Sequence, residues 1–422
     1  MLAAAFVIAV TAMIKEVLGW LMNQEPWLMF AAPFAGILCA VVLLHLVAQG
    51  KAVQRVSGSK APPRRFTAWL RFPASAVRAD LTADVVRHAG REESFPWRLA
   101  PIRAAAIVCT VGLGAPMGTE SPAAHLGVAA GSAIGGRPGW LRSLARPAGL
   151  GGGAAGVAAL MGLPLVGLVF MLELGRRKQA ALSLPRILAA GSGALVGWGF
   201  SVAFDLDFIR LVVPAIAPGD LVKALATAAL VGALSGAVGS VTGTAIYQAR
   251  SWSAGPRTKL IAGSAVLLGS FLAISMLATP AAAIGPGGGT ISWAEATTAS
   301  VWVILVVALL RCVATTAAVA AGGVGGLFVP LLAIGDLCGR SLAPMLGVSG
   351  DLGAAAGAAG AIAGGYRQPL TAITMVLTVG GPAPSRLTCV VAALVATGTG
   401  VLTAYRLDRY VLHRKAGTPT AH

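Results

Sequence analysis

Charged residues are scarce along this chain of 422 residues. Asp, Glu, Lys and Arg together make up 11% of the sequence, whereas soluble domains carry about a quarter. This shortage excludes an ordinary soluble protein. Apolar residues instead make up 56%, and they gather in runs near the ~20 residues that cross a hydrocarbon core. We therefore predict an all-α polytopic membrane protein, with apolar spans that include residues 27–47, 221–246, 259–277 and 299–321.

Cysteine and histidine are few and scattered. No cysteine forms a C-x-x-C pair, and neither residue type shows the spacing of a metal site. We expect no disulfide, no metal and no cofactor. The H-E-x-x-H and G-x-S-x-G motifs are also missing, so we do not expect an enzyme. The five cysteines are Cys39, Cys109, Cys312, Cys338 and Cys389.

Acidic charge is the rarer sign, and the formal net charge is +17. The basic residues cluster in polar stretches beside apolar spans, as the positive-inside rule describes for cytoplasmic loops. Aromatic residues are not interleaved with them, so we exclude nucleic-acid binding. Residues 1–22 are apolar from the start, with Lys15 as the first basic residue. We predict a first membrane helix there rather than a signal peptide.

Glu120 is an acidic residue in the middle of a glycine-rich apolar stretch, GLGAPMGTESP, and we expect an apolar helix over 99–117 to lead into it. A related motif, GLFVP at 326–330, opens another apolar helix about half a chain further on. Two such Gly/Pro-interrupted segments in corresponding halves point to a transporter with internal repeats.

Each motif is expected to place a helix N-terminus, with outward amides and a positive dipole end, near the bilayer midplane. Paired N-termini of this kind bind an anion without any arginine. Glu120 would occupy the anion's place when charged and swing away when protonated, and would thus gate the pore. The alternative is a structural carboxylate that caps the helix. The matching GLFVP motif favours the gate.

Four stretches resemble motifs of the CLC family of chloride channels and chloride/proton exchangers. GTESPAAHLG (118–127) resembles G-[K/R]-E-G-P-x-x-[H/Q]-[I/L]-G, and GGLFVPLLAIG (325–335) resembles G-G-x-F-x-P-x-L-x-x-G. PLVGLVFMLEL (164–174) and RQPLTAITMVL (367–377) are similar to two further family stretches, in the same order. The chain is identified as a divergent member of this family.

The resemblance implies a CLC-like inverted repeat of tilted and re-entrant helices, and a homodimer with one pore per subunit. It implies that Glu120 is the gate and that His125 packs between helices. Backbone groups at the two motifs and a pore tyrosine would bind the anion, namely Gly118, Thr119, Ser121, Gly326, Leu327, Phe328, Val329 and either Tyr405 or Tyr410. We expect one transport domain over 1–412, repeats at about 1–205 and 215–412, a polar tail at 413–422 and no cytoplasmic regulatory domain.

Three departures from the family pattern bear on function. The family's G-S-G-I-P stretch, whose serine helps to hold the central anion, has RADLT at 78–82 as its gapless counterpart. Ser121 replaces a glycine, and Thr119 replaces a basic residue. In FMLEL, Glu173 matches the first glutamate of the family's F-x-L-E-E, and Leu174 matches the second, which carries protons in the exchangers. Because leucine cannot relay a proton, we expect no strict proton coupling unless Glu173 takes that role.

The leading hypothesis is transmembrane transport of small anions, above all chloride, gated by Glu120. The first alternative is proton-coupled exchange, or export of another halide such as fluoride. The second is a degenerate membrane scaffold that no longer conducts, which the lost G-S-G-I-P supports and the retained Glu120 opposes. Asp336, an extra acid in a predicted span, is a candidate for conduction. High Ala, Gly and Arg usage points to the plasma membrane of a bacterium.

Overall fold

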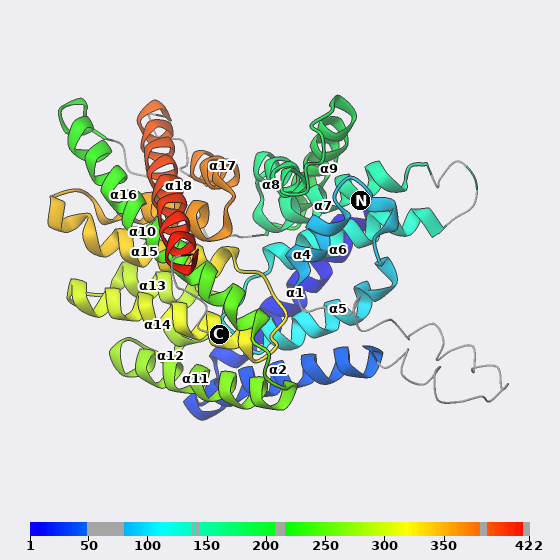
Figure 1. Cartoon of the computed structure of the whole chain (residues 1–422), viewed down its shortest axis with the longest axis horizontal. Coiled ribbons are helices and arrows are strands. Elements are labelled where there is room, and N and C mark those ends of the chain that lie inside the picture. The colour runs from blue at the N-terminus through cyan, green and yellow to red at the C-terminus, as the bar shows by residue number, and fades with distance from the viewer. Residues whose placement is uncertain (49–79, 137–138, 140–142, 207–215, 380–385, 417–422) are drawn as a thin grey trace. The chain divides into compact units, whose positions relative to one another are not determined.

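The computed structural model describes residues 1–48, 80–136, 139, 143–206, 216–379 and 386–416 (Figure 1). Within these residues the regular structure is helical, apart from an isolated β-bridge between Gly118 and Gly326. Eight of the described helices are long and apolar enough to cross a membrane. The predicted all-α polytopic fold is therefore confirmed.

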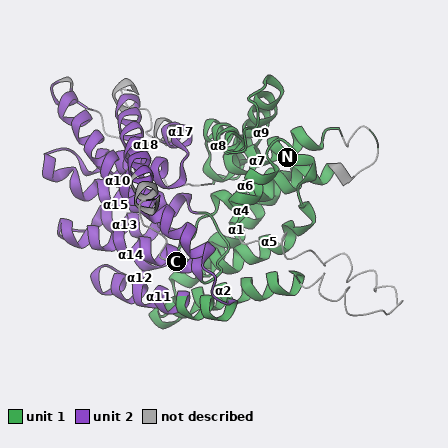
Figure 2. Cartoon of the chain, viewed as in Figure 1, with its two compact units in different colours: residues 1–206, 256–262, 321–326 green, residues 207–255, 263–320, 327–422 purple. Residues whose placement is uncertain are grey.

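Unit 1, the first of two compact units, comprises residues 1–206, 256–262 and 321–326 (Figure 2). Its centre is α7, which packs against α6 on one side and α9 on another. The elements are α1 (Leu2–Met22), α2 (Pro26–Ala48), α4 (Leu81–His88), η1 (Glu92–Ser94), η2 (Trp97–Leu99), α5 (Ala100–Ile107), η3 (Val108–Gly112), α6 (Glu120–Ser132), η4 (Ala133–Gly136), α7 (Ala145–Met161), α8 (Pro164–Arg176) and α9 (Leu184–Ala203).

Unit 2 comprises residues 207–255, 263–320 and 327–422. Here the long helix α10 packs against α16 and α18, and α15 packs against α14 and α16. The elements are η6 (Pro218–Asp220), α10 (Leu221–Ser251), α11 (Pro256–Leu277, which begins in unit 1), α12 (Pro280–Ala283), α13 (Gly288–Ala296), α14 (Val301–Ala320), α15 (Phe328–Leu342), η7 (Pro344–Leu346), α16 (Gly350–Ala361), η8 (Ile362–Tyr366), α17 (Pro369–Val379) and α18 (Arg386–Ala416).

The helix expected over 99–117 ends earlier than predicted. α5 passes into a π-helical turn, η3, which ends at Gly112. Gly114 then takes φ 88°, a left-handed conformation that glycine adopts without steric penalty. The Ala115 amide donates to the Thr110 carbonyl (3.0 Å) and closes the turn. The chain is thereby redirected just before the GTESP motif.

Glycine sets how closely the helices approach one another. In unit 1, a β-carbon on Gly127 would collide with the Gly152 carbonyl, and one on Gly152 with the Gly127 carbonyl. In unit 2, Gly335 of α15 and Gly357 of α16 face each other's carbonyls in the same reciprocal way. Such small-residue contacts are how helices pack tightly when lipid removes the hydrophobic drive to associate.

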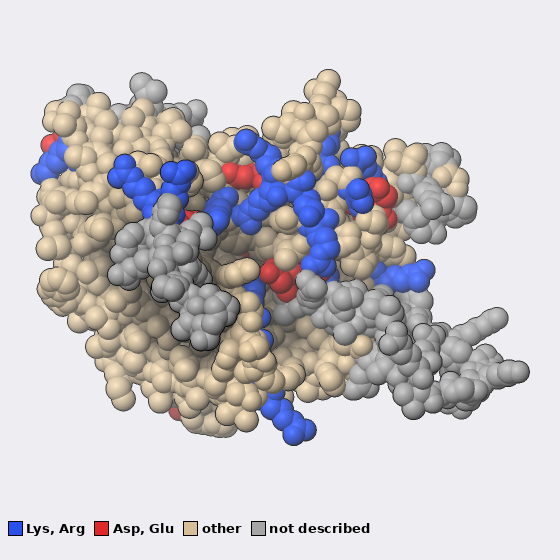
Figure 3. Space-filling model, in the orientation of Figure 1, with Lys and Arg blue, Asp and Glu red and all other residues tan. Residues whose placement is uncertain are grey.

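Large apolar side chains also cover the outside of the long helices. Val222, Ile261, Met276 and Trp302 are each more than two thirds exposed. Figure 3 shows that most of the visible surface carries no charge. A helix that is apolar on its packed and exposed sides alike is typical of a membrane span. These side chains face the lipid.

Candidate functional site

Glu120 is the first residue of α6, and its side chain is fully buried. Pro122 fits the third helical position because an amide there would have no acceptor within the helix. The Ala123 amide donates the first helical bond to the Thr119 carbonyl (2.8 Å). The leading amides of a helix point out of its hydrogen-bond ladder, at the positive end of the dipole. The first turn of α6 therefore favours negative charge where the Glu120 carboxylate lies.

Gly118 and Gly326 are joined by two backbone hydrogen bonds within unit 1. The Gly118 amide donates to the Gly326 carbonyl (2.7 Å), and the Gly326 amide donates to the Gly118 carbonyl (2.6 Å). A β-carbon on Gly326 would lie 3.3 Å from Oε2 of Glu120 and 3.2 Å from the Ser121 nitrogen. The leading glycines of both predicted motifs thus lie together, and Gly326 leaves room for the glutamate.

Thr82 is a neighbour of this site that sequence reasoning missed. The Asp80 carboxylate caps α4 by accepting from the Ala83 amide (3.0 Å). Two residues after Asp80, the Thr82 hydroxyl donates to Oγ of Ser121 (2.9 Å). The counterpart of the missing G-S-G-I-P stretch therefore places a hydroxyl beside the start of α6. Positions 78 and 79 of that stretch lie outside the described residues.

A buried ionic network supports α6 one turn below Glu120. Arg103 of α5 is fully buried, donates to Nε2 of His125 (2.8 Å) and pairs with the Asp84 carboxylate (2.5 Å). Because arginine only donates, His125 must accept at Nε2 and be neutral. Burial raises the pKa of the Asp84 carboxyl, and the Arg103 guanidinium opposes that shift. The predicted packing role of His125 extends to a hydrogen bond that fixes its ring.

The network has only a weak signature in the sequence. Asp84 precedes the helix expected over 99–117, Arg103 lies inside it, and nothing in their spacing pairs them. The Phe95 ring packs edge-on against the His125 ring, with centroids 4.9 Å apart. Tertiary packing alone turns these residues into a support for α6.

In unit 2, α15 starts with the same geometry as α6. Leu327 has φ −119° and ψ −3°, close to the −105° and −6° of Thr119. Phe328 and Val329 are buried, and the Leu331 amide donates to the Leu327 carbonyl (3.1 Å). The ring of Phe328 meets the buried Tyr366 edge-on, with centroids 5.9 Å apart. Tyr366 directly precedes the RQPLTAITMVL stretch (367–377), and it was not predicted from the sequence as a site residue.

The predicted tyrosines and the predicted proton-pathway residue lie on other helices than α6 and α15, namely α18 and α8. Tyr405 of α18 is 52% exposed and lies under the Arg409 guanidinium, 4.7 Å from its ring centroid. Tyr410 belongs to the same helix, but its side chain is outside the described residues. Glu173 and Leu174, both on α8, are buried.

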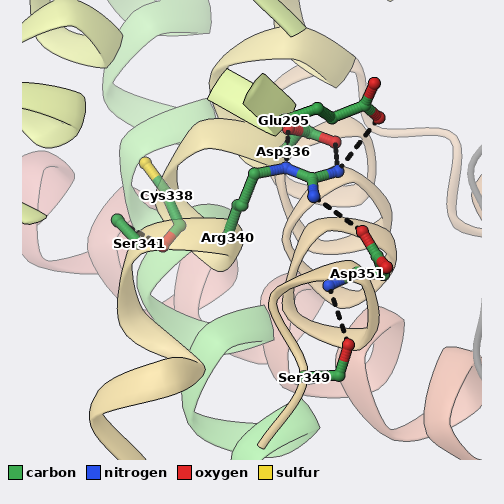
Figure 4. Close-up of polar contacts among 7 residues, drawn as sticks. All are labelled: Glu295, Asp336, Cys338, Arg340, Ser341, Ser349 and Asp351. Atoms are coloured by element: carbon green, nitrogen blue, oxygen red, sulfur yellow. Dashed lines mark hydrogen bonds and ion pairs between the residues drawn. The ribbon is translucent and has the colours of Figure 1, made fainter. Parts of the chain in front are cut away.

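Asp336 is not a solitary buried charge, as Figure 4 shows. It lies on α15 and accepts from Nε of Arg340, one turn later on the same helix (3.2 Å). Arg340 also donates to Glu295 of α13 (3.3 Å) and to Asp351 of α16 (2.6 Å). The guanidinium therefore joins three helices of unit 2, and this arrangement gives Asp336 a structural partner.

The described residues contain no group of three or more His, Cys, Asp or Glu side chains that could hold a metal ion. Cys39, Cys109, Cys312 and Cys338, the cysteines whose side chains the structure describes, are free thiols. In unit 1, the first turn of α6 and the hydroxyls of Thr82 and Ser121 lie beside the buried Glu120, and a helix N-terminus is a setting that favours anions.

Comparison with known proteins identifies the family. The family model described as "Voltage gated chloride channel" matches residues 66–401, most of the chain. The chain belongs to this family.

Two curated relatives of this CLC chain are named H(+)/Cl(-) exchange transporter ClcA. The one from Yersinia pestis bv. Antiqua (strain Angola) is 28% identical over 320 residues, which cover 72% of this chain and 66% of the relative. The one from Salmonella typhi is 29% identical over 325 residues, which cover 72% and 67%. This CLC chain thus aligns with about two thirds of each relative's length.

Solved structures agree on the CLC fold. A slow cyanobacterial Cl-/H+ antiporter has a TM-score of 0.70 at 17% identity, covering 99% of this chain and 96% of its own. A CLC-type fluoride/proton antiporter has a TM-score of 0.69 at 21% identity, with 95% and 93% covered. The predicted CLC-like fold and the predicted multi-pass membrane location are confirmed.

Proposed function

We propose that this CLC protein transports small anions, chloride above all, and that Glu120 gates the anion position at the start of α6. One observation carries the proposal: a fully buried carboxylate lies at the positive end of a helix, against the glycine backbone of Gly326. A buried carboxylate is costly unless its surroundings favour negative charge. Surroundings that favour a carboxylate also favour a halide.

The gate follows from competition for one position. When charged, the Glu120 carboxylate occupies the anion's place at the α6 amides. An anion that arrives there repels the charged carboxylate and thereby favours its protonated, neutral form. Neutral Glu120 is no longer held by the dipole and leaves the position to the anion. The Thr119 hydroxyl donates to Oε1 of Glu120 (3.4 Å), so we expect this hydrogen bond to break when the glutamate side chain leaves the position.

Thr82 and Ser121 supply the hydroxyls for this position. Their 2.9 Å hydrogen bond joins the first turns of α4 and α6, two helices whose positive ends need a negative charge nearby. We assign to this pair the part that the family's serine plays.

Within unit 2, the first turn of α15 has its own leading amides at Phe328 and Val329, just after Leu327, and we propose that they also bind an anion. Among the tyrosines, the buried Tyr366 that packs on Phe328 fits an anion-binding role better than the exposed Tyr405.

Proton coupling separates the two leading versions of this function. Leu174 stands in place of the second glutamate of F-x-L-E-E, the one that carries protons in the exchangers, and this replacement favours uncoupled transport. The relatives named as H(+)/Cl(-) exchangers favour coupling. In a coupled transporter, the buried Glu173 beside Leu174 is our candidate for the proton carrier.

The test is efflux of chloride, fluoride and nitrate from liposomes that contain the purified protein, with external pH recorded simultaneously. Glu120→Gln removes the charge of the gate, and Glu25→Gln, an exposed residue, is the matched control. We expect anion flux that changes its pH dependence in E120Q but not in E25Q. Flux without proton movement supports the uncoupled version, and stoichiometric proton movement supports exchange. Absence of flux for all three anions would favour the degenerate scaffold.

We also propose that two copies associate through lipid-exposed apolar helices, each copy with its own pore. Mass measurement in detergent tests the association. Mixed dimers of wild type and E120Q test the independence of the pores, because independent pores give the average flux of the two parents.

A further inference from the structure

Arg311 is one of two fully buried arginines among the largest buried side chains. It lies on α14, a helix apolar enough to span the membrane. Its NH1 donates to the Ala283 carbonyl (2.7 Å), and its NH2 donates to the Gly285 carbonyl (2.7 Å). Both acceptors are neutral backbone carbonyls, one on the last residue of α12 and the other in the segment that leads to α13. The guanidinium is therefore oriented by hydrogen bonds that leave its charge in place.

Comparison with Arg103 makes the difference plain. Arg103 is equally buried but is neutralised by the Asp84 carboxylate. Within the described part of the chain, no carboxylate pairs with Arg311. Arginine stays protonated in proteins, and an uncompensated buried charge is strongly destabilising. Among the residues that the structure describes, Arg311 thus has no counter-charge.

Two further polar atoms on this face of α14 lack partners. Nε of Arg311 and Oγ1 of Thr315 are buried without a hydrogen bond among the described residues. The two residues are four apart, so they lie on one face of the helix, and the Thr315 side chain leans toward Arg311. The protein therefore leaves the charge incompletely satisfied.

The guanidinium lies behind the first turns of α15. A β-carbon on Gly287 would be 3.7 Å from NH2 of Arg311 and 3.7 Å from the Val329 carbonyl oxygen, and it would touch Ala333. Gly287 has φ 138°, so the chain passes between α14 and α15 where a side chain has no room. The backbone at Gly287 thus lies between the buried guanidinium of Arg311 and the start of α15, and electrostatic interactions between buried groups are weakly screened.

We propose that Arg311 is a specificity-determining residue whose missing counter-charge is the transported anion. It does not contact the anion. Its fixed charge instead raises the positive electrostatic potential at the first turn of α15, from the far side of the Gly287 backbone. The inference rests on the proposed function, since it requires a small monovalent anion at that turn. It predicts that the protein without its anion is destabilised by Arg311, and that halide binding relieves this.

A purely structural role makes a different prediction. Ala283 is the last residue of α12, and a helix C-terminus leaves carbonyls that a cation satisfies. If the role of Arg311 is only to satisfy these carbonyls, chloride binding and stability depend on its hydrogen bonds and not on its charge. Arg311→Gln keeps amide donors and loses the charge, whereas Arg311→Lys keeps the charge and loses the planar fork.

The experiment measures chloride binding to purified protein by calorimetry, together with thermal unfolding over a series of chloride concentrations. Arg257→Gln, at an exposed position on α11, is the control for net charge. We expect R311Q to weaken chloride binding about tenfold or more, R311K by less than about threefold, and R257Q not measurably. The rise of the unfolding temperature with chloride should be lost in R311Q and kept in R311K.

Three results would overturn the inference: unchanged chloride affinity in R311Q, equal loss in R311Q and R311K, or a chloride-dependent stabilisation that persists in R311Q. If R311Q does not fold, R311K decides alone, because a structural fork predicts loss and a charge predicts retention. Failure of the proposed function looks different. Wild type would then bind chloride in an Arg311-dependent way and still show no flux in liposomes.

Discussion

The helix pair α6–α7 of unit 1 and the pair α15–α16 of unit 2 share one construction. In both, the first helix starts after a residue of nearly equal φ and ψ, and proline stands in its third position. In both, reciprocal glycines bring the helices into backbone contact. Backbone geometry is therefore repeated, although the side chains between the matching glycines and prolines are largely different.

The two pairs differ in where they carry charge. The first helical residue is Glu120 in α6 and Phe328 in α15. Behind α6, Arg103 is neutralised by Asp84, whereas behind α15 Arg311 has no such partner. One helix thus carries an acidic residue at its start, and the other has a buried arginine near its first turns. A repeated scaffold allows the two halves to take different electrostatic roles, since the scaffold depends on glycine and proline alone.

The largest effect is expected from filling the glycine contacts. A β-carbon on Gly131 would collide with the Ala148 carbonyl, and one on Gly339 with the Gly353 carbonyl. Because backbone carbonyls cannot move aside, Gly131→Ala and Gly339→Ala should each cost about 3 kcal/mol or more of folding free energy. Gly199→Ala and Gly269→Ala, which meet nothing within 4 Å, are the controls. Thermal unfolding in detergent measures this. A large loss of folding free energy in only one of the two variants would show that the two helix pairs do not depend on their glycine contacts in the same way.

A loss of stability of similar size is expected when the buried Arg103–Asp84 pair that supports α6 is broken. Arg103→Leu leaves Asp84 as a buried, unpaired carboxylate and should destabilise the protein by about 3–5 kcal/mol. The double variant with Asp84→Leu should recover most of that loss, because no charge remains buried. Arg340→Lys in unit 2 should cost at most about 1 kcal/mol, since two of the three carboxylates around it are about half exposed. Equal losses of stability in R103L and R340K would show that the burial of a charge network does not decide how much it contributes to stability.

The smallest effect tests the hydroxyl pair beside Glu120. Thr82→Val removes one donor and keeps the shape, so it should cost about 1 kcal/mol of stability or of anion affinity. We expect the ratio of chloride to fluoride flux to change about fivefold, as it should in Ser121→Ala. Thr279→Val, which removes the hydroxyl cap of α12, is a matched control for stability alone. An unchanged flux ratio in T82V would remove Thr82 from the anion position.

The span predictions came from composition, and the structure bears them out closely. The first membrane helix, interpreted from residues 1–22, is α1, and the run at 221–246 lies in α10. Apolar length is enough for such a prediction because lipid leaves the helix as the only way to satisfy the backbone. The helix expected over 99–117 was placed less well, since a π-turn and Gly114 end it by local geometry that apolarity does not reveal.

The candidate site was predictable only in part. GTESP and GLFVP indicated Glu120 and the start of α15, because glycine and proline have fixed conformational meanings at a helix start. Thr82 and Tyr366 were missed, since nothing in a threonine or a tyrosine says which helix end it will face. Asp336 was interpreted as a candidate for conduction, and its Arg340 partner shows a structural contact that its sequence neighbours did not suggest.

By itself, the sequence determined that this protein lies in a membrane and starts two corresponding helices at glycine-flanked motifs. These two properties follow from composition and from residues whose backbone preferences are local, whereas the resemblance of whole motifs indicated the CLC family. Only the tertiary structure decided which buried charges are paired. Arg103 and Arg311 look alike in the sequence, yet one meets a carboxylate and the other meets carbonyls. Charge pairing depends on contacts between distant segments, and those contacts exist only once the helices are packed.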